Sequence, residues 1–362
     1  MGAFNLNSIW LAILLLNIVV AVHELGHFLA ARACGVKVHE FSIGFGPLVT
    51  KFNWKGVQYS LRWILIGGFC KIAGMDIALE GEPEQESVPQ EKLFYFKPLW
   101  QKLIILVAGP FFNLLMAILV LFGTAAFIGL PGPTSNALVY QVTAGSPANQ
   151  AGIRKGDQIV ALNRKSIQGT EIAKIIGKSG GKPLQVTVRR NGVLLTKELT
   201  PKYDTAAKRY TMGIVYGVLP KLERVSLGQA AGKALSLPVT MVKLVGMIFN
   251  GRAKADLSGP IMVVDMVDQS LQLPLIYILV YLLSFSVTLN MSLFLFNLIP
   301  IPLPILDGGW VAILLLERLF HHEFSTEQKA AAQMLGLLLV IILAVMATYG
   351  DILRIVRRLL GG

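Results

Sequence analysis

Five consecutive residues, His23-Glu24-Leu25-Gly26-His27, have the types and the spacing of a zinc-binding helix. In an α-helix, residues i and i+4 lie on one face, so the imidazoles of His23 and His27 can bind a single Zn²⁺ ion. Zinc lowers the pKa of a bound water to about 7, and the Glu24 carboxylate, next to the first ligand, is placed to accept the proton. The motif therefore predicts a hydrolytic zinc centre with His23 and His27 as ligands and Glu24 as the catalytic base.

Chance is the alternative explanation of this motif, because typical His and Glu frequencies produce HExxH about once in a hundred chains of this length. The motif follows directly on the apolar run 9–22, which places it inside a predicted membrane span. Ionisable side chains at that depth are energetically costly and are usually functional. The position of the motif therefore favours a functional zinc site over a chance match.

A catalytic zinc usually has three protein ligands and one open position. Asp307, in the sequence Leu-Asp-Gly-Gly after a late apolar segment, is the expected third ligand, because a carboxylate among apolar residues and glycines needs a charged partner. The alternative role for Asp307 is to cap the N-terminus of a helix over 309–316. Weaker candidates for the third ligand are His39 and Glu40, which lie in a strand-like segment, and 321–323, a His-His-Glu run without i, i+4 spacing.

The composition indicates a membrane protein. Of 362 residues, 54% are hydrophobic and 15% are charged, and the mean hydropathy is +0.61, whereas soluble proteins carry about 25% charged residues. The net charge of +12 is typical of Lys and Arg near anionic lipid headgroups. No arginine-rich tract with interleaved aromatic residues occurs, which argues against nucleic-acid binding. The two cysteines, Cys34 and Cys70, form no CxxC pattern, so neither a thiolate zinc site nor a disulfide framework is expected.

Four segments are apolar and long enough to cross a bilayer as helices, which takes about 20 residues. These are 9–31, 103–130, 275–299 and 334–349, the last extended by the Ala-rich stretch before it. A cleaved signal peptide is the competing interpretation of the first segment, but no basic region precedes it and no small-residue cleavage site follows it. Four retained spans are therefore expected.

Between the second and third spans, 136–202 has the alternating strand and turn pattern of a soluble domain. Three of its segments, 144–148 (Ala-Gly-Ser-Pro-Ala), 151–153 (Ala-Gly-Ile) and 155–159 (Lys-Gly-Asp-Gln-Ile), resemble a PDZ domain of the bacterial protease type. PDZ domains bind extended chain ends by strand addition, and the resemblance implies a peptide-binding edge near 138–140. The alternative is a domain that only blocks access sterically.

The combination of HExxH in the first span and Leu-Asp-Gly after a late span resembles the site-2 protease family of intramembrane zinc metalloproteases. Within that family it resembles the bacterial regulator-of-sigma-E protease group, here with a single PDZ domain. Further matching segments are Glu40–Pro47, Tyr59–Arg62, Gly67–Lys71, Ala108–Asn113 and Leu257–Pro260. The resemblance implies a membrane-associated β-hairpin at about 49–63, in which Tyr59 and Leu61 bind an unwound substrate segment as an added strand.

One segment departs from this group, whose pattern is Asn-x-x-Pro-x-Pro-x-Leu-Asp-Gly. Asn297, Pro300 and Pro302 match its first half and 304–308 its second half, but two extra residues lie between the halves. The resemblance implies that Asn297 and Pro302 bind substrate near the zinc, and it leaves Asp307 as a ligand because the residues that flank it match. The alternative role for Asn297 is that of a polar residue that joins two helices.

The sequence thus predicts a mostly α membrane protein with four transmembrane helices, a membrane-associated β-hairpin region and an inserted PDZ-like α+β domain. The expected parts are 1–31, the first transmembrane helix with HExxH; 32–99, the β region and an acidic loop over 76–91; 100–130, the second transmembrane helix; 136–202, the PDZ-like domain; 203–271, an amphipathic connector on the membrane surface; 272–350, the third and fourth transmembrane helices with the Leu-Asp-Gly motif; and 351–362, a basic tail.

The function implied by the resemblance is zinc-dependent hydrolysis of peptide bonds in or near the membrane spans of single-span proteins, such as anti-sigma factors or remnant signal peptides. It implies a multi-pass protein of the bacterial inner membrane, with the PDZ-like domain outside the cytoplasm and able to bind a peptide or protein. Two alternatives stay open. One is a catalytically inactive scaffold, against which the intact Glu24 argues. The other is a metal transporter, which a single ligand cluster in the membrane disfavours.

Overall fold

The structure, a computed structural model, describes residues 5–75, 88–167, 171–205, 209–251, 259–271 and 273–359. The chain divides into two compact units, the first formed by residues 1–123 and 228–362 and the second by residues 124–227. Each unit is described by itself.

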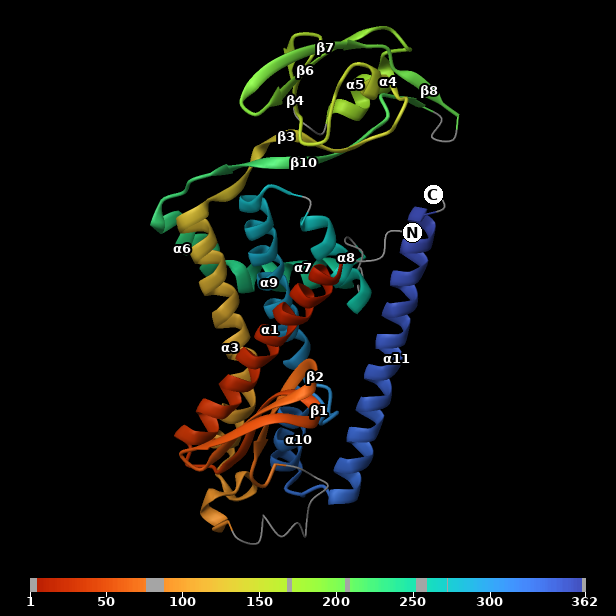
Figure 1. The fold of residues 1–362 in the computed structure, drawn as a ribbon. Helices are drawn as coiled ribbons and strands as arrows, with labels where there is room; N and C mark the ends of the chain where they lie inside the picture. Colours follow the sequence, from red (N-terminus) through yellow and green to blue (C-terminus); the bar gives the residue numbers. More distant parts are fainter. Residues whose placement is uncertain are drawn as a thin grey trace. The chain divides into compact units, whose positions relative to one another are not determined.

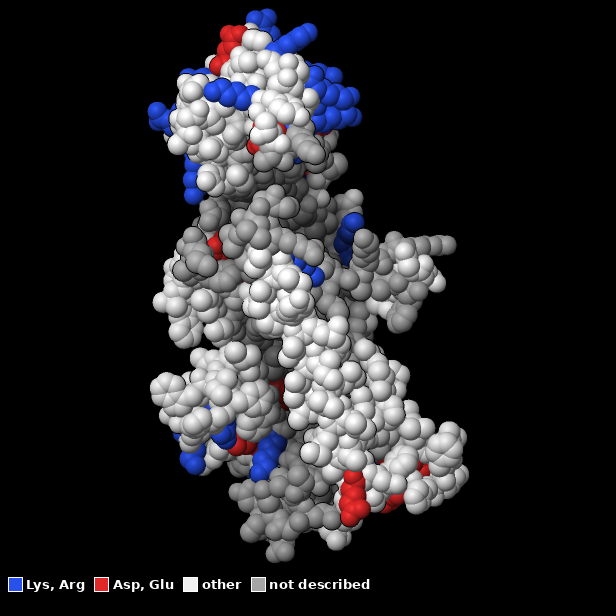
Figure 2. All heavy atoms as spheres, turned by 90° about the vertical axis from the view of Figure 1, so that its right-hand side faces the viewer, with Lys and Arg blue, Asp and Glu red and all other residues white. Residues whose placement is uncertain are grey.

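Among the described residues, four helices are long and apolar enough to cross a membrane. They are α1 (Leu6–Ala33), α3 (Leu99–Gly123, continued to Ile128 by the π-turn η3), α9 (Leu275–Asn297) and α11 (Thr326–Leu359) (Figure 1). The four predicted spans are thereby confirmed in number and order. The last helix begins earlier than expected, because the alanines at 330–332 continue it toward its N-terminus. Figure 2 shows the side on which α11 lies, where uncharged side chains cover most of the described surface of the first unit, as lipid contact requires.

The segment after α1 forms two long strands, β1 (Val38–Trp54) and β2 (Val57–Ile72), which confirms the predicted hairpin. Lys55 and Gly56 make its turn with φ angles of 49° and 74°, the left-handed conformation that tight hairpin turns need. Residues 40–43 pair with 68–71 on one side and with 58–61 on the other, so the first half of β1 lies between the two halves of β2. Most of the expected acidic loop, 76–87, lies outside the described residues.

A shared core joins the hairpin to the helices. Its buried members come from α1, β1, β2, α3 and the segments just before β1 and α3, and they are Ala31, Val36, Val38, Val57, Ile72, Phe94, Ile105 and Leu106. Cys34 and Cys70 are free thiols packed against this core. Asn17 of α1 also donates a hydrogen bond to the carbonyl of Leu65, so the hairpin is fixed to the first helix by polar as well as apolar contacts.

Shorter elements complete the first unit. They are η1 (Gln90–Lys92), η2 (Phe94–Phe96), α6 (Leu227–Leu235), α7 (Leu237–Phe249), α8 (Pro260–Ser270) and α10 (Asp307–Phe320). Helix α7 packs Leu237 and Met241 against α3 and α9 and exposes Val239 and Val242. Helix α8 is joined by hydrogen bonds to both α1 and α11. Its Asp268 accepts a hydrogen bond from Ser8 of α1, and Asp351 of α11 accepts from the backbone N–H of Gly259 and Met262 at its start.

The second unit is built on a six-stranded sheet with strand order β10-β3-β4-β6-β7, in which β5 also pairs with β4. Its elements are β3 (Leu130–Val142), α4 (Pro147–Gln150), β4 (Gln158–Leu162), β5 (Lys165–Ser166), α5 (Ile172–Lys178), β6 (Leu184–Arg190), β7 (Val193–Leu199), the separate pair β8 (Lys202–Asp204) and β9 (Arg209–Thr211), and β10 (Ile214–Glu223). Strands β9 and β10 fall in the segment that the sequence assigned to a surface connector. That expectation is wrong for 209–223, because β10 pairs with β3 along its length.

The predicted peptide-binding edge at 138–140 is also wrong. Leu138 pairs with Gly217 of β10 on one side and with Gln158 of β4 on the other. Strand β3 is therefore an interior strand, and both of its edges near these residues are occupied. In the described sheet, the unpaired edges belong to β10 and β7.

Asp157 fixes the turn before β4. Its carboxylate is fully buried, accepts two hydrogen bonds of 2.7 Å from Arg190, and accepts another of 2.9 Å from the backbone N–H of Arg154. Burial raises the pKa of Asp157, but these hydrogen bonds outweigh it and hold the pKa below its ordinary value. The second unit therefore depends on an ionised carboxylate in its interior.

Candidate active site

The structure brings His23, His27 and Asp307 together, although Asp307 comes from a helix distant in sequence. The two Nε2 atoms are 3.2 Å apart, and the Asp307 carboxylate places one oxygen 3.2 Å from His23 Nε2 and the other 3.3 Å from His27 Nε2. Both histidines are buried, with exposed fractions of 7% and 6%. Within the described parts of the chain, these three form the one group whose side-chain atoms are close enough to share a metal ion.

The spacing of these atoms fits a tetrahedral zinc ion. Two ligand atoms that each lie about 2.1 Å from such an ion are roughly 3.4 Å apart, close to the separations of 3.2 and 3.3 Å found here. Asp307 Oδ2 is buried and makes no hydrogen bond within the described residues, which is costly unless a cation is its partner. The donor set of two imidazoles and one carboxylate is one that catalytic zinc uses.

Two glycines bring α3 close to the motif helix. A methyl group at Gly26 would overlap the carbonyl oxygen of Ala108, and one at Gly109 would overlap His27 Nε2 itself. Small residues of this kind allow membrane helices to approach at backbone distance. The glycines of His-Glu-Leu-Gly-His and Ala-Gly-Pro therefore explain why both segments carry the family resemblance.

Both imidazoles are oriented from α3 through their second nitrogen. His27 Nδ1 lies 2.8 Å from the carbonyl oxygen of Ile105, so Nδ1 carries the proton and leaves Nε2 as a ligand. The Asn113 amide nitrogen lies 3.5 Å from His23 Nδ1, while its Oδ1 is buried and has no hydrogen-bond partner among the residues that the structure describes. Rotating the amide by 180°, an assignment that heavy-atom positions do not fix, lets Oδ1 accept from His23 Nδ1–H and satisfies both atoms.

Asn113 is the residue that sequence reasoning missed, since it appeared there only as the end of a matching segment. It is fully buried in α3. The signal that points to it is its type and depth, because an amide in the middle of an apolar span needs a polar partner. That partner is His23.

Glu24 lies beside the cluster without belonging to it. It is half-buried on α1, and its carboxylate accepts a hydrogen bond from the backbone of Cys70 on β2. Its carboxylate is close enough to His27, His23 and Asp307 to interact electrostatically with all three. This is the position that a base needs to take a proton from a water in the cluster.

Asp307 is placed by the proline-rich segment between α9 and α10. Hydrogen bonds from Ile301 N to Ile299 O, from Leu303 N to Ile301 O and from Ile305 N to Leu303 O form successive three-residue turns, each centred on a proline. The two extra residues relative to the family pattern add one more repeat of this ribbon. Gly308 and Gly309 then pack directly on its carbonyl groups.

The alternative role of Asp307 as a helix cap is not observed. Helix α10 begins at Asp307 itself, its N-cap residue is Leu306, and no side chain makes a capping hydrogen bond there.

The other candidate ligands lie elsewhere. Glu40 accepts hydrogen bonds from Ser60 and Arg62. Burial raises the pKa of Glu40, but these hydrogen bonds outweigh burial and hold the pKa below its ordinary value. His321 ends α10, away from the cluster.

The four residues proposed for substrate binding do not join the metal cluster. Tyr59 packs among the rings of Phe28, Phe41, Phe52 and Trp54, and Leu61 is half-buried in β2, paired with Ile43 and Thr50. Asn297 ends α9 and is half-buried, and Pro302 is exposed in the proline ribbon.

Comparison with known proteins agrees with this geometry. The model of peptidase family M50 matches residues 11–343. The chain belongs to this family, the site-2 proteases. The M50 chain is 30% identical to a Clostridium acetobutylicum protein that carries the name of a zinc metalloprotease, over 97% of this chain and 98% of that one. It is 30% identical to the metalloprotease MmpA of Caulobacter vibrioides, over 94% of each chain. It is 25% identical to the regulator of sigma-W protease RasP of Bacillus subtilis, over 96% of this chain and 99% of RasP. The protein is a zinc metalloprotease of the membrane.

Proposed function

We propose that this M50 peptidase hydrolyses peptide bonds within or near the membrane spans of single-span proteins, with His23, His27 and Asp307 as zinc ligands. The observation that carries the proposal is the cluster in which His23 and His27, buried on a helix of spanning length, meet Asp307, with Glu24 beside it. Hydrolysis at that depth requires the scissile peptide bond of the substrate to lie at the same depth.

The residues of the site divide the chemistry between them. Zinc held by His23, His27 and Asp307 supplies Lewis acidity to a water and to the scissile carbonyl. Glu24 accepts the proton from the attacking water and then delivers it to the leaving amine as the carbon–nitrogen bond breaks. Asn113 and the carbonyl of Ile105 hold the two imidazoles in the tautomer that leaves Nε2 available.

A helical substrate must be unwound before cleavage, because its carbonyl groups are occupied by helical hydrogen bonds. We propose that the β1–β2 hairpin, with Tyr59 and Leu61, receives the unwound segment as an added strand. Asn297 and Pro302, at the end of α9 and in the proline ribbon, are proposed to contact the substrate backbone from the other side.

The second unit is proposed to be a PDZ-like domain outside the cytoplasm, in a multi-pass protein of the bacterial inner membrane. Its glycine turns and buried Asp157 support this assignment. Strand addition would use the free edge of β10 or β7, since β3 is enclosed. The same unit would serve equally as a barrier to substrates with bulky external domains. Substrates of the anti-sigma type are suggested by the name of RasP alone.

The test is cleavage of purified single-span membrane proteins by the purified chain in detergent, with and without a chelator. We expect internal cleavage that stops with chelator and returns with added Zn²⁺. Cleavage that persists in chelator would assign the proteolysis to a reaction without zinc, and an unchanged substrate in every condition would favour the alternative of an inactive membrane scaffold.

A further inference from the structure

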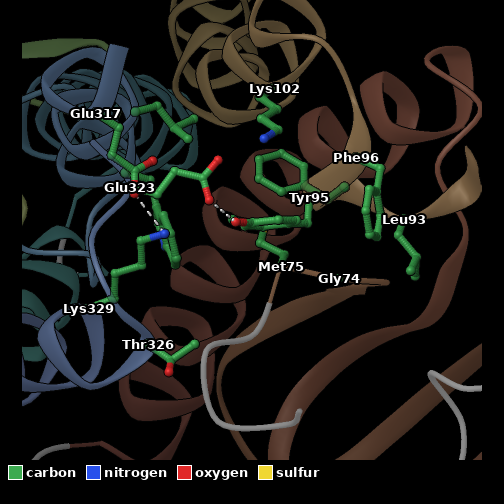
Figure 3. Close-up of a pocket in the computed structure, with 13 residues that line it drawn as sticks. Gly74, Met75, Leu93, Tyr95, Phe96, Lys102, Glu317, Glu323, Thr326 and Lys329 are labelled. Carbon is green, nitrogen blue, oxygen red and sulfur yellow. Dashed lines mark hydrogen bonds and ion pairs between the residues drawn. The ribbon is translucent and has the colours of Figure 1, made fainter. Parts of the chain in front are cut away.

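A second cavity lies in the first unit, away from the metal cluster, where the ends of three helices meet. It has a volume of about 300 Å³ and is lined by the start of α3, one face of α10, the start of α11 and the segments 74–75 and 93–96 (Figure 3). Its apolar wall includes Met75, Phe94, Trp310 and Leu314. The reaction proposed above uses none of these residues.

Four charged side chains of described residues face this cavity, and two of them form an ion pair with each other. Lys329 Nζ lies 2.8 Å from Glu317 Oε1, and both side chains are about nine-tenths buried. The Glu323 carboxylate accepts a 2.6 Å hydrogen bond from the Tyr95 hydroxyl. Lys102 extends over the Tyr95 ring, 5.0 Å from its centre (Figure 3), and no carboxylate of a described residue is within 4.0 Å of its ammonium group. Lys102 and Glu323 therefore present opposite charges to one space without touching each other.

The cavity lies at the level where the membrane spans begin. Thr326, the first residue of one span, lines it, and so does Lys102 in the first turn of another. Three aromatic side chains around the start of α3, Tyr95, Phe96 and Trp100, are 48%, 55% and 59% exposed. Exposed aromatic residues at helix ends are typical of the boundary between lipid and water, so the cavity opens at headgroup depth.

We propose that this cavity binds the headgroup of a zwitterionic phospholipid of the phosphatidylethanolamine type. Lys102 contacts the phosphate, Glu323 accepts hydrogen bonds from the primary ammonium group, and the acyl chains leave over the exposed ring of Phe96. The headgroup bridges the two opposite charges that the cavity holds apart.

Charge balance selects the zwitterion. The two lysines and two glutamates sum to zero, so a neutral headgroup adds no net charge to a half-buried space, whereas an anionic lipid adds a charge facing two carboxylates. An occupant would also contact Trp310 and Leu314 of α10, the helix that begins with Asp307. The proposal does not depend on zinc or on proteolysis.

The test is native mass spectrometry of the full-length chain in detergent, titrated with phosphatidylethanolamine, phosphatidylcholine or phosphatidylglycerol of identical acyl chains. Loss of one charge-assisted hydrogen bond typically costs about tenfold or more in affinity. We therefore expect Lys102→Met to bind phosphatidylethanolamine about tenfold more weakly than the wild type, and Lys102→Arg to retain binding. The matched control is Lys243→Met on the exposed face of α7, which should bind as the wild type does.

A second variant tests the ammonium site. Glu323→Gln should weaken phosphatidylethanolamine binding and leave phosphatidylglycerol binding unchanged or stronger, because the cavity then carries a net positive charge. Soluble phosphoethanolamine should compete only weakly, since it lacks the chains. Equal affinity of the wild type and Lys102→Met for phosphatidylethanolamine would overturn the proposal. So would a wild-type preference for phosphatidylglycerol, or competition by soluble phosphoethanolamine at the concentration of the lipid.

Discussion

Glu24 is next to the proposed zinc ligand His23 in sequence but is not a member of the cluster, so the proposed base can be removed without removing the metal. Glu24→Gln should retain wild-type zinc content and lose about 10²–10⁴-fold in cleavage rate, because an amide cannot accept the proton of the attacking water. Metal analysis and cleavage of a single-span substrate measure the two quantities. His23→Ala is the control and should lose zinc as well as activity. A wild-type rate in Glu24→Gln would assign the base to another residue.

Asn113 contacts the proposed zinc ligand His23, so its effect should appear in zinc affinity before it appears in turnover. Loss of a hydrogen-bond partner behind a ligating histidine typically costs 10–100-fold in affinity. Asn113→Leu should therefore release zinc to a competing chelator about 10–100-fold more readily. Asn113→Asp keeps an acceptor for His23 Nδ1–H and should restore most of the affinity. Equal loss in both variants would mean that Asn113 serves packing alone.

At the scale of elements, the approach of α1 to α3 sets the position of His27. Gly109→Ala introduces a methyl group where His27 Nε2 lies, so the helices must separate or the imidazole must rotate. Either change should lower zinc affinity and cleavage together. The control is Gly123→Ala in the same helix, where nothing lies within 4 Å of the added methyl group. If both alanine variants bind zinc as the wild type does, this close approach is not required by the site.

The elements differ in how far local sequence determines them. The spacing of His23 and His27 fixes their shared face, and the apolar runs fix the four spans, because both depend on residues close in the chain. The pairing of β10 with β3 joins residues far apart in sequence, and no local pattern specifies it. Asp307 was predictable as a candidate ligand from the residues that flank it. The contact of Asn113 with His23, in contrast, required the packing of two helices to be known.

At the scale of the whole chain, the second unit should have a stability that depends on pH through Asp157. Its pKa is lower in the folded unit than in the unfolded chain, so its contribution is complete above about pH 4 and is lost as the pH falls through the depressed value. Asp157→Asn should remove about 2 kcal/mol at neutral pH. Hydrogen exchange of β4 and β6 amides in the full-length chain measures this. Glu198→Gln, which changes a carboxylate without a hydrogen bond among the described residues, should have no such effect.

Four spans predict that both chain ends and the second unit face the same side of the membrane. Single cysteines at positions 2, 180 and 362, in a background without Cys34 and Cys70, should all react with an impermeant thiol reagent from one side. Reaction of positions 2 and 362 from opposite sides would mean that one of the four helices does not cross.

The origin of Asp307 in a late helix has a consequence during biosynthesis. His23 and His27 leave the ribosome early, and most of the chain must follow before their carboxylate partner exists. At about 5–20 residues per second, this interval is roughly tens of seconds. Throughout it the nascent protein lies in the membrane with its base in place and its metal site incomplete. With the proposed ligand set, the zinc site can be completed only after the third membrane span has been synthesised.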